Sequence, residues 1–217
     1  MRYGGRASTW VMACTLRQRS RRRYSLGIVA GTFSKFHKGH RYLLSRAFSL
    51  ADIVIVCLTT DDFARRLGKE HPVEEYCERL KSLVNALRDM GTAHRAIIWP
   101  LNDMYGPAVT EKGAEVLFVS EESFLRGLKV NRARVSRGLR GLDIYVVPLL
   151  LAEDGRPISS TRIWRGEIDA EGRAKAKIYG DAIVWRAAGR RVDHGLRSRR
   201  AEEEEGGAGE PPGEAEE

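Results

Sequence analysis

The stretch that most constrains the fold is residues 26–40, where a short apolar run leads through a glycine into a segment with two histidines. Residues 26–30 suit a buried strand, and Gly31 allows a sharp turn that leaves the backbone open to a ligand. Residues 40–50 carry apolar side chains at helical spacing, and a second apolar run follows at residues 52–58. A strand, a helix and a strand in this order predict a right-handed crossover within a parallel sheet.

Further apolar runs continue the same alternation. Strands are expected at residues 94–101, 115–119 and 142–148, helices at residues 73–90 and from Ser120 onwards, and polar loops at residues 59–72 and 102–108. The uninterrupted apolar character of residues 52–58 is typical of a parallel strand that is covered on both faces. We therefore predict an α/β protein with a Rossmann-like, doubly wound, parallel five-stranded sheet, formed by a single domain over residues 26–169.

The charge of the chain is concentrated at its ends. The net charge of the 217 residues is +8, but residues 1–25 carry +7, residues 170–200 carry +6 and the Glu-rich residues 201–217 carry −8, which leaves +3 for the body. We therefore expect no nucleic-acid binding by the folded part, and we predict disordered extensions at residues 1–25 and 170–217.

Alternatives stay open for parts of these extensions. Residues 1–25 are Arg-rich and acid-free, so they also fit an arm that touches nucleic acid, a transit peptide, or sequence upstream of the true start. Residues 174–185 fit a short strand or a short helix.

The cysteines and the hydropathy of the chain indicate the cellular environment in which the protein resides. Cys14, Cys57 and Cys77 are widely spaced and form no CxxC pair, which argues against a disulfide framework or a thiolate zinc site. A reducing, cytoplasmic environment is the simple interpretation. No apolar run approaches the roughly 18 residues that a membrane span needs, so we expect no membrane association.

The two histidines of residues 31–40, the first motif, predict phosphate chemistry. His37 and His40 are three residues apart, so a helix that begins near them places both imidazoles on one face. Gly39 removes a side chain where a ligand must come close. A helix N-terminus attracts anions, and imidazoles can donate hydrogen bonds to phosphate oxygens. Two surface histidines at a helix start are the simpler alternative, but the glycines and the strand–turn–helix context favour a phosphate site.

A hydroxyl cluster forms a second motif, residues 158–163. Ser159, Ser160 and Thr161 stand at a predicted helix start, where hydroxyls can cap the helix or bind phosphate oxygens. Arg162 follows, and its planar guanidinium suits phosphate. Helix capping accounts for one hydroxyl but not for three with an adjacent arginine.

Other polar residues have both a structural and a functional interpretation. Lys69 could receive a substrate phosphate or be an ordinary charge in a solvated loop. Arg79 could face a substrate or pair with Glu75 along a helix. Ser120 is a natural N-cap. The arginines of residues 131–140 form a basic stripe with no interleaved aromatic residues.

The two motifs together resemble a known superfamily. Gly31-Thr32-Phe33 followed by His37-Lys38-Gly39-His40 resembles the GTFD…HxGH signature of the adenylyl- and cytidylyltransferases, and residues 158–163 resemble their ISST-R signature. Residues 100–108 and 147–155 look like the archaeal type of phosphopantetheine adenylyltransferase. The resemblance covers about residues 26–169. Ser34 stands where the family usually has Asp, and Trp164 where it often has a second Arg.

The resemblance implies transfer of the adenylyl group of ATP to 4′-phosphopantetheine, which gives dephospho-coenzyme A and pyrophosphate. It implies that His37 and His40 are catalytic and contact the α- and β-phosphates, and that Mg²⁺ arrives with ATP. The implied ATP-binding residues are Gly31, Thr32, Phe33, Gly39, Ser120, Glu121, Ser159, Ser160, Thr161 and Arg162, and the implied acceptor-binding residues are Thr32, Lys69 and Tyr105.

Two alternatives remain. The same chemistry could serve another acceptor, such as nicotinamide mononucleotide, FMN or a phosphoalcohol. The chain could also be a nucleic-acid-binding module on an inactive nucleotidyltransferase fold that uses its basic ends. The sequence indicates no oligomeric state.

Overall fold

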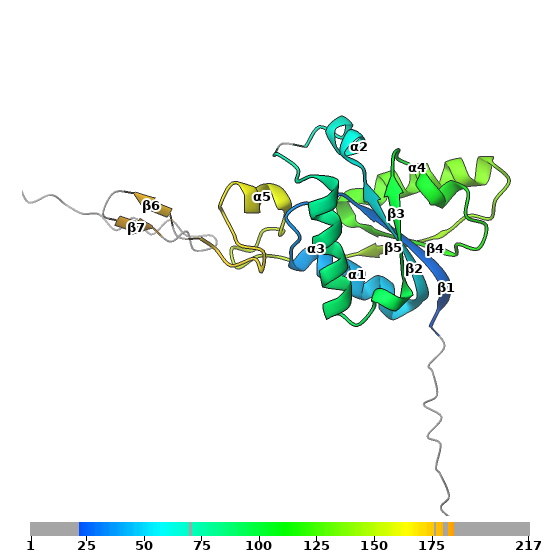
Figure 1. Ribbon diagram of the computed structural model, residues 1–217, viewed down its shortest axis with the longest axis horizontal. Helices are drawn as coiled ribbons and strands as arrows, with labels where there is room; N and C mark the ends of the chain where they lie inside the picture. The colour runs from blue at the N-terminus through cyan, green and yellow to red at the C-terminus, as the bar shows by residue number, and fades with distance from the viewer. Residues whose placement is uncertain (1–21, 70, 176, 180–181, 185–217) are drawn as a thin grey trace, which may run out of the picture.

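The computed structural model describes residues 22–69, 71–175, 177–179 and 182–184, and its centre is a five-stranded sheet (Figure 1). The strands are β1 (Tyr24–Gly31), β2 (Ala51–Thr59), β3 (Ala96–Leu101), β4 (Val116–Ser120) and β5 (Asp143–Val147). They lie in the order β3-β2-β1-β4-β5, and every neighbouring pair is parallel. The predicted parallel sheet is confirmed, and its winding reverses between β1 and β4.

Helices cover both faces of this sheet (Figure 1). They are α1 (Lys38–Leu50), α2 (Asp61–Arg66), α3 (Tyr76–Asp89), α4 (Phe124–Ser136) and α5 (Ser160–Trp164), with 3₁₀ turns η1 (Ala93–Arg95), η2 (Gly106–Val109) and η3 (Glu121–Ser123). Val29 packs in one core with α1 and α3, and its neighbour Ile28 packs in a second core with α4 and η2. Successive strand residues point to opposite faces, so a continuous apolar run fills both cores. No helix in the described part of the chain is long and apolar enough to cross a membrane.

The predicted loop at residues 59–72 contains α2, a short helix that the sequence pattern did not suggest. Thr60 caps it by accepting a hydrogen bond from the Phe63 amide. Asp61 and Asp62 lie in its first turn and Arg65 and Arg66 in its last, which matches the helix dipole. A six-residue helix is too short to show an apolar periodicity, so capping was the only available signal.

The ordered body extends beyond the predicted limits at both ends. β1 begins at Tyr24, whose hydroxyl donates to Asp143 over 2.8 Å, and Arg22 pairs with Asp52. Residues 174–185 fitted either a short strand or a short helix in the sequence analysis. The structure has two strands there, β6 (Lys177–Tyr179) and β7 (Ala182–Val184), which form an antiparallel pair. Of the predicted extensions, residues 1–21, 176, 180–181 and 185–217 lie outside the described residues.

The chain after β5 folds into a small unit of its own, residues 150–175. Antiparallel bridges join Leu151 to Pro157 and Ile168 to Ala174. Its core consists of Ala152, Ile158 and Ile168, packed with Leu150 and Ile163. The amide of Lys38 at the start of α1 donates to the carbonyl of Ala170 over 2.9 Å, and so brings the second motif next to the first.

Arg79 is buried inside the body, which corrects both sequence interpretations of this residue. Its side chain is 1% exposed and donates to the carbonyl oxygens of Thr32, Thr59 and Glu74 and to the carboxylate of Asp61. It pairs with Asp61 rather than Glu75, and it joins Thr32 of the first motif to the end of β2 and to the segment before α3.

Arg134 is also fully buried, so the predicted basic stripe on α4 is interrupted. Its guanidinium donates to backbone carbonyls, among them those of Ala108, Glu111 and Arg140. A guanidinium carries five N–H donors, and here they bind the turns around η2 instead of an anion at the surface.

Candidate active site

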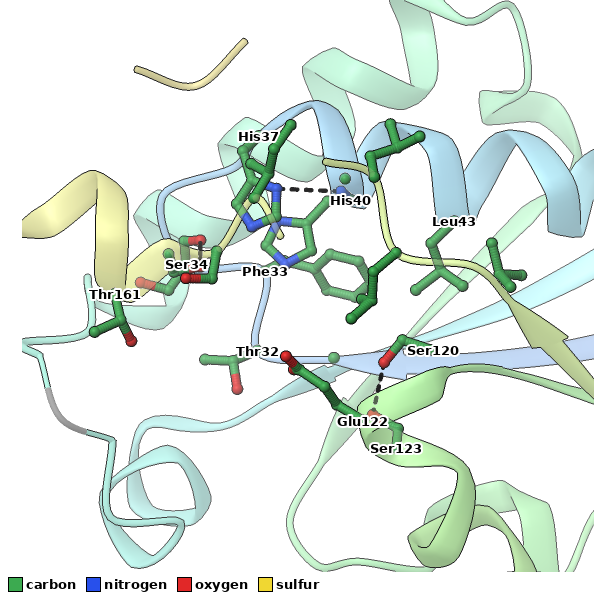
Figure 2. Close-up of a pocket in the computed structure, with 18 of the residues that line it drawn as sticks. Thr32, Phe33, Ser34, His37, His40, Leu43, Ser120, Glu122, Ser123 and Thr161 are labelled. Carbon is green, nitrogen blue, oxygen red and sulfur yellow. Dashed lines mark hydrogen bonds between the residues drawn. The ribbon is translucent and has the colours of Figure 1, made fainter. Parts of the chain in front are cut away.

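The main cleft opens at the carboxyl ends of β1 and β4, where the winding of the sheet reverses (Figure 2). Open α/β sheets bind ligands at this position. The polar lining of the cleft consists of Gly31, Thr32, Ser34, His37, Gly39, His40, Lys69, His71, Ser120, Glu122, Ser123, Arg126, Ser159, Ser160 and Thr161. Both sequence motifs therefore border one cavity. Figure 2 shows Ser34 and Thr161 on one side of it and Ser120, Glu122 and Ser123 on the other.

The turn after β1 has an unusual backbone. Phe33 and Lys35 have φ values of 52° and 44°, in the left-handed region that costs non-glycine residues about 1–3 kcal/mol each. Glu74 holds this turn in place: it accepts the Ser34 hydroxyl over 2.6 Å and the Lys35 amide over 3.0 Å. The ring of Phe33 is buried in the core, which also anchors the turn. The strain is thus maintained by the segment that precedes α3.

The two histidines stack on each other at the start of α1. Their ring centroids are 3.8 Å apart and the rings are inclined by 21°. His37 is the N-cap, and its Nδ1 accepts the His40 amide over 3.4 Å. Its proton therefore resides on Nε2, which is left as a donor. A Cβ at Gly39 would lie 3.0 Å from the His37 ring, so the glycine makes room for the imidazole itself.

Burial keeps both imidazoles neutral. It lowers the pKa of His37 to about 4. Burial also lowers the pKa of His40 well below its usual value, with smaller contributions from the neighbouring His37 ring and from Lys69. The Nδ1 of His40 is buried and has no hydrogen-bond partner among the described residues. Buried polar atoms are almost always paired, so this one indicates a site that a ligand completes.

The backbone amides of α1 contribute less than expected. The Lys38 amide donates to Ala170, the His40 amide to His37 Nδ1 and the Arg41 amide to the carbonyl of His37. The imidazoles, rather than a row of free N–H groups, are the main polar groups that α1 offers to the cleft.

The three hydroxyls of the second motif have different partners. Ser159 caps α5 by accepting the Arg162 amide, and its own proton has no acceptor among the described residues. Ser160 donates its proton to the carbonyl of Ser34 over 2.6 Å, which joins the two motifs directly. The Thr161 hydroxyl lies 3.1 Å from Nδ1 of His71. Ser159 is thus the hydroxyl of the three that is free to donate to an anion.

Arg162 does not line the main cleft. Its guanidinium is paired with Glu167 over 3.0 Å and with Asp154, and it also donates to the Pro157 carbonyl. The predicted contact of Arg162 with phosphate would require it to leave two carboxylates. The exposed Trp164 follows two residues later.

Three of the four remaining predicted residues line one of two cavities. Lys69 and Ser120 line the main cleft. Ser120 occupies the predicted N-cap position, at the start of η3, but its side chain makes no capping hydrogen bond and its hydroxyl donates to Ser123 instead. Glu121 is exposed and lines neither cavity, whereas Glu122 lines the main cleft. Tyr105 lines a neighbouring cavity, the apolar hollow.

The apolar hollow adjoins the main cleft on the α4 side of the sheet. The two cavities share Ala30, Gly31, Thr32, Ser123 and Arg126. The remaining wall is largely apolar and includes Phe63, Leu67, Leu101, Met104, Tyr105, Ala108 and Val130. A ligand with a charged group and an apolar arm would fit across the junction.

Sequence reasoning missed four polar residues that line the main cleft: His71, Glu122, Ser123 and Arg126. His71 is buried beside Ser34 and Thr161, and it follows closely on Lys69, which sequence reasoning had singled out. Arg126 lines both cavities from α4, and nothing in the sequence separates it from the other arginines of that helix.

Comparisons with known proteins agree with this architecture. The model of the cytidylyltransferase-like family matches residues 28–166. A phosphopantetheine adenylyltransferase from Methanothermobacter thermautotrophicus is 42% identical over 160 residues, which cover 74% of this chain and 95% of that protein. One from Methanosarcina barkeri is 43% identical over 153 residues, covering 69% and 92%. A solved structure from Archaeoglobus fulgidus, of unknown function, is 26% identical with a TM-score of 0.50 and covers 56% of this chain and 87% of its own.

Proposed function

The chain belongs to the cytidylyltransferase-like family and, within it, to the phosphopantetheine adenylyltransferases, and on this basis we propose that it transfers the adenylyl group of ATP to 4′-phosphopantetheine. The products would be dephospho-coenzyme A and pyrophosphate. The observation that carries the proposal is the meeting of His37 and His40 with Ser159 in one cleft at the reversal of the sheet.

The reaction needs no nucleophile from the protein. An oxygen of the 4′-phosphate would attack the α-phosphorus of ATP, and the bond from that phosphorus to the bridging oxygen of the β-phosphate would break. Pyrophosphate would leave with the bonding electron pair. The protein would hold the reactants in line and stabilise the charge that develops on the phosphates. Hydrogen-bond donors at fixed positions are the groups that this task requires.

The site offers such donors. The Nε2–H of His37 would bind a non-bridging oxygen near the bond that breaks, with His40 beside it. The negative triphosphate would raise the pKa of both imidazoles, since an opposite charge favours the protonated ring. The free hydroxyl of Ser159 would hold the pyrophosphate portion, and Thr32, at the junction of the two cavities, would orient the acceptor phosphate.

Mg²⁺ would come with the nucleotide. Glu122 is the one carboxylate among the described residues that line the main cleft, so the ion would be held by phosphate oxygens and water, which Mg²⁺ prefers. When bound, Mg²⁺ would neutralise part of the phosphate charge.

The apolar hollow would take the acceptor's arm. Pantetheine is a flexible chain with a branched apolar end and amide groups, and the wall around Leu101, Met104 and Tyr105 suits it better than a charged nicotinamide ring. Lys69 and Arg126 would attract its phosphate from either side of the cleft.

The test is to incubate the full chain with ATP, Mg²⁺ and 4′-phosphopantetheine and to detect dephospho-coenzyme A by mass spectrometry. Parallel reactions contain nicotinamide mononucleotide or FMN. We expect product from phosphopantetheine alone. A dinucleotide formed from one of the other acceptors, with no dephospho-coenzyme A, would show that the acceptor is misassigned.

A further inference from the structure

His71 links the two motifs of the site. It lies in the segment between α2 and α3, and its imidazole is buried. Its Nε2 is 3.3 Å from the Ser34 hydroxyl of the first motif, and its Nδ1 is 3.1 Å from the Thr161 hydroxyl of the second. We propose that His71 is a positioning residue that controls whether Thr161 can donate a hydrogen bond to the triphosphate. This inference rests on the proposed function, because it takes ATP as the ligand.

The proton on Nε2 follows from the partners of Ser34. The Ser34 hydroxyl has one proton and donates it to Glu74 over 2.6 Å. Its oxygen can therefore only accept from His71, so Nε2 of His71 carries a proton in either charge state of the ring.

The state of Nδ1 then decides what Thr161 can do. In the neutral ring Nδ1 is an acceptor, so Thr161 gives its proton to His71 and presents only lone pairs to the cleft. In the protonated ring Nδ1 is a donor, and the Thr161 proton is free for a phosphate oxygen. Lone pairs repel phosphate, whereas a hydroxyl donor binds it. ATP would therefore bind more tightly to the protein in which His71 is protonated, and ATP binding would be accompanied by proton uptake.

Charged groups surround this imidazole on several sides. Glu74, paired with Lys35, is reached through Ser34, and Lys69 lines the main cleft with His71. Another cavity, on the α2 side, also includes His71, and its charged lining residues are Asp61, Arg65, Lys69 and Glu75. From α5 the imidazole meets the neutral hydroxyl of Thr161, while Arg162 is paired elsewhere. A variant at any of these groups would shift the pH at which the effect occurs, so the test keeps them unchanged.

The experiment measures ATP affinity by titration calorimetry from pH 6 to pH 8.5, without acceptor. The proteins are the parent chain, His71→Asn, Thr161→Val, the double variant and a control, His94→Asn, which changes an exposed histidine of η1. At pH 6 we expect His71→Asn and Thr161→Val each to weaken ATP binding by about 10-fold, the effect of losing one hydrogen bond to a charged group. The double variant should be no weaker than either single variant, because both remove the same contact.

The quantity to compare across pH is the ratio of the variant's dissociation constant for ATP to that of the parent. It should be largest at pH 6 and shrink as the pH rises, because fewer parent rings are then protonated and Thr161 donates less often. Taking the ratio removes the titration of ATP itself and of His37 and His40, and His94→Asn should give a ratio near one throughout.

A constant ratio across this pH range, or additive losses in the double variant, would overturn the proposal and leave His71 a purely structural residue. If His71→Asn does not fold by circular dichroism, Thr161→Val alone decides by the same pH comparison. Because no acceptor is present, a failure to form dephospho-coenzyme A would reject the proposed function without affecting this result.

Discussion

Replacing the buried Arg79 with Met should destabilise the fold strongly and loosen the first motif. Arg79 makes four contacts to the carbonyls of Thr32, Thr59 and Glu74 and to Asp61 at 2.7–3.0 Å. Removing one partner of a buried ion pair costs about 3–5 kcal/mol, and each buried acceptor left unsatisfied costs about 1–3 kcal/mol. Water entering from the partly exposed Asp61 would relieve part of this cost. We therefore expect a loss of about 4 kcal/mol in the free energy of unfolding.

The assay is urea unfolding followed by circular dichroism. With a slope of about 2 kcal/mol per M urea, the midpoint should fall by about 2 M. Arg88→Met, an exposed arginine of the same helix, is the matched control and should change stability by less than about 0.5 kcal/mol. A loss below about 1 kcal/mol for Arg79→Met would refute the reasoning, since it would mean that the carbonyls find other donors at no cost.

The remaining predictions concern the histidine pair. His40→Ala should lower turnover by about 10²–10³, with ATP affinity less affected; turnover within a few-fold of the parent would show that His40 is misassigned. Gly39→Ala should raise helix propensity by up to about 1 kcal/mol yet lower turnover, because its Cβ would lie 3.0 Å from the His37 ring; unchanged turnover would refute this steric role. The pKa of His37 is about 4 in the fold and about 6.5 in the unfolded chain, so the unfolded state binds the extra proton first. The parent should therefore lose up to about 3 kcal/mol relative to His37→Asn as the pH falls from 7 to 4, measured by urea unfolding; parallel curves would contradict it.

The sheet and the convergence of the motifs could be predicted because they depend on local patterns. The apolar runs at β1 and β2 and the helical pattern of α1 leave few ways to arrange the chain, and parallel strands bring their carboxyl ends to one edge. The glycine turn and the hydroxyl cluster each carried a chemical signal in a few adjacent residues.

The partners of individual side chains could not be predicted in this way. Arg79 and Arg134 look like other arginines in the sequence, and only the tertiary fold surrounds them with carbonyl oxygens. Arg162 is diverted from the cleft by Asp154 and Glu167, which lie eight residues before it and five after it in a loop whose path the sequence does not determine. The Ser34–Glu74 bond spans 40 residues, so no local pattern could reveal it.

The unit after β5 has a consequence for how the protein would lose activity on heating. It contributes Ser159 to the cleft, yet among its described residues only Ala152, Ile158 and Ile168 form a buried apolar core. So small a core can open while the sheet stays intact, as local unfolding in proteins commonly does. Inactivation would then occur at a lower temperature than the loss of circular dichroism, and bound ATP, by bridging both parts, would bring the two temperatures together.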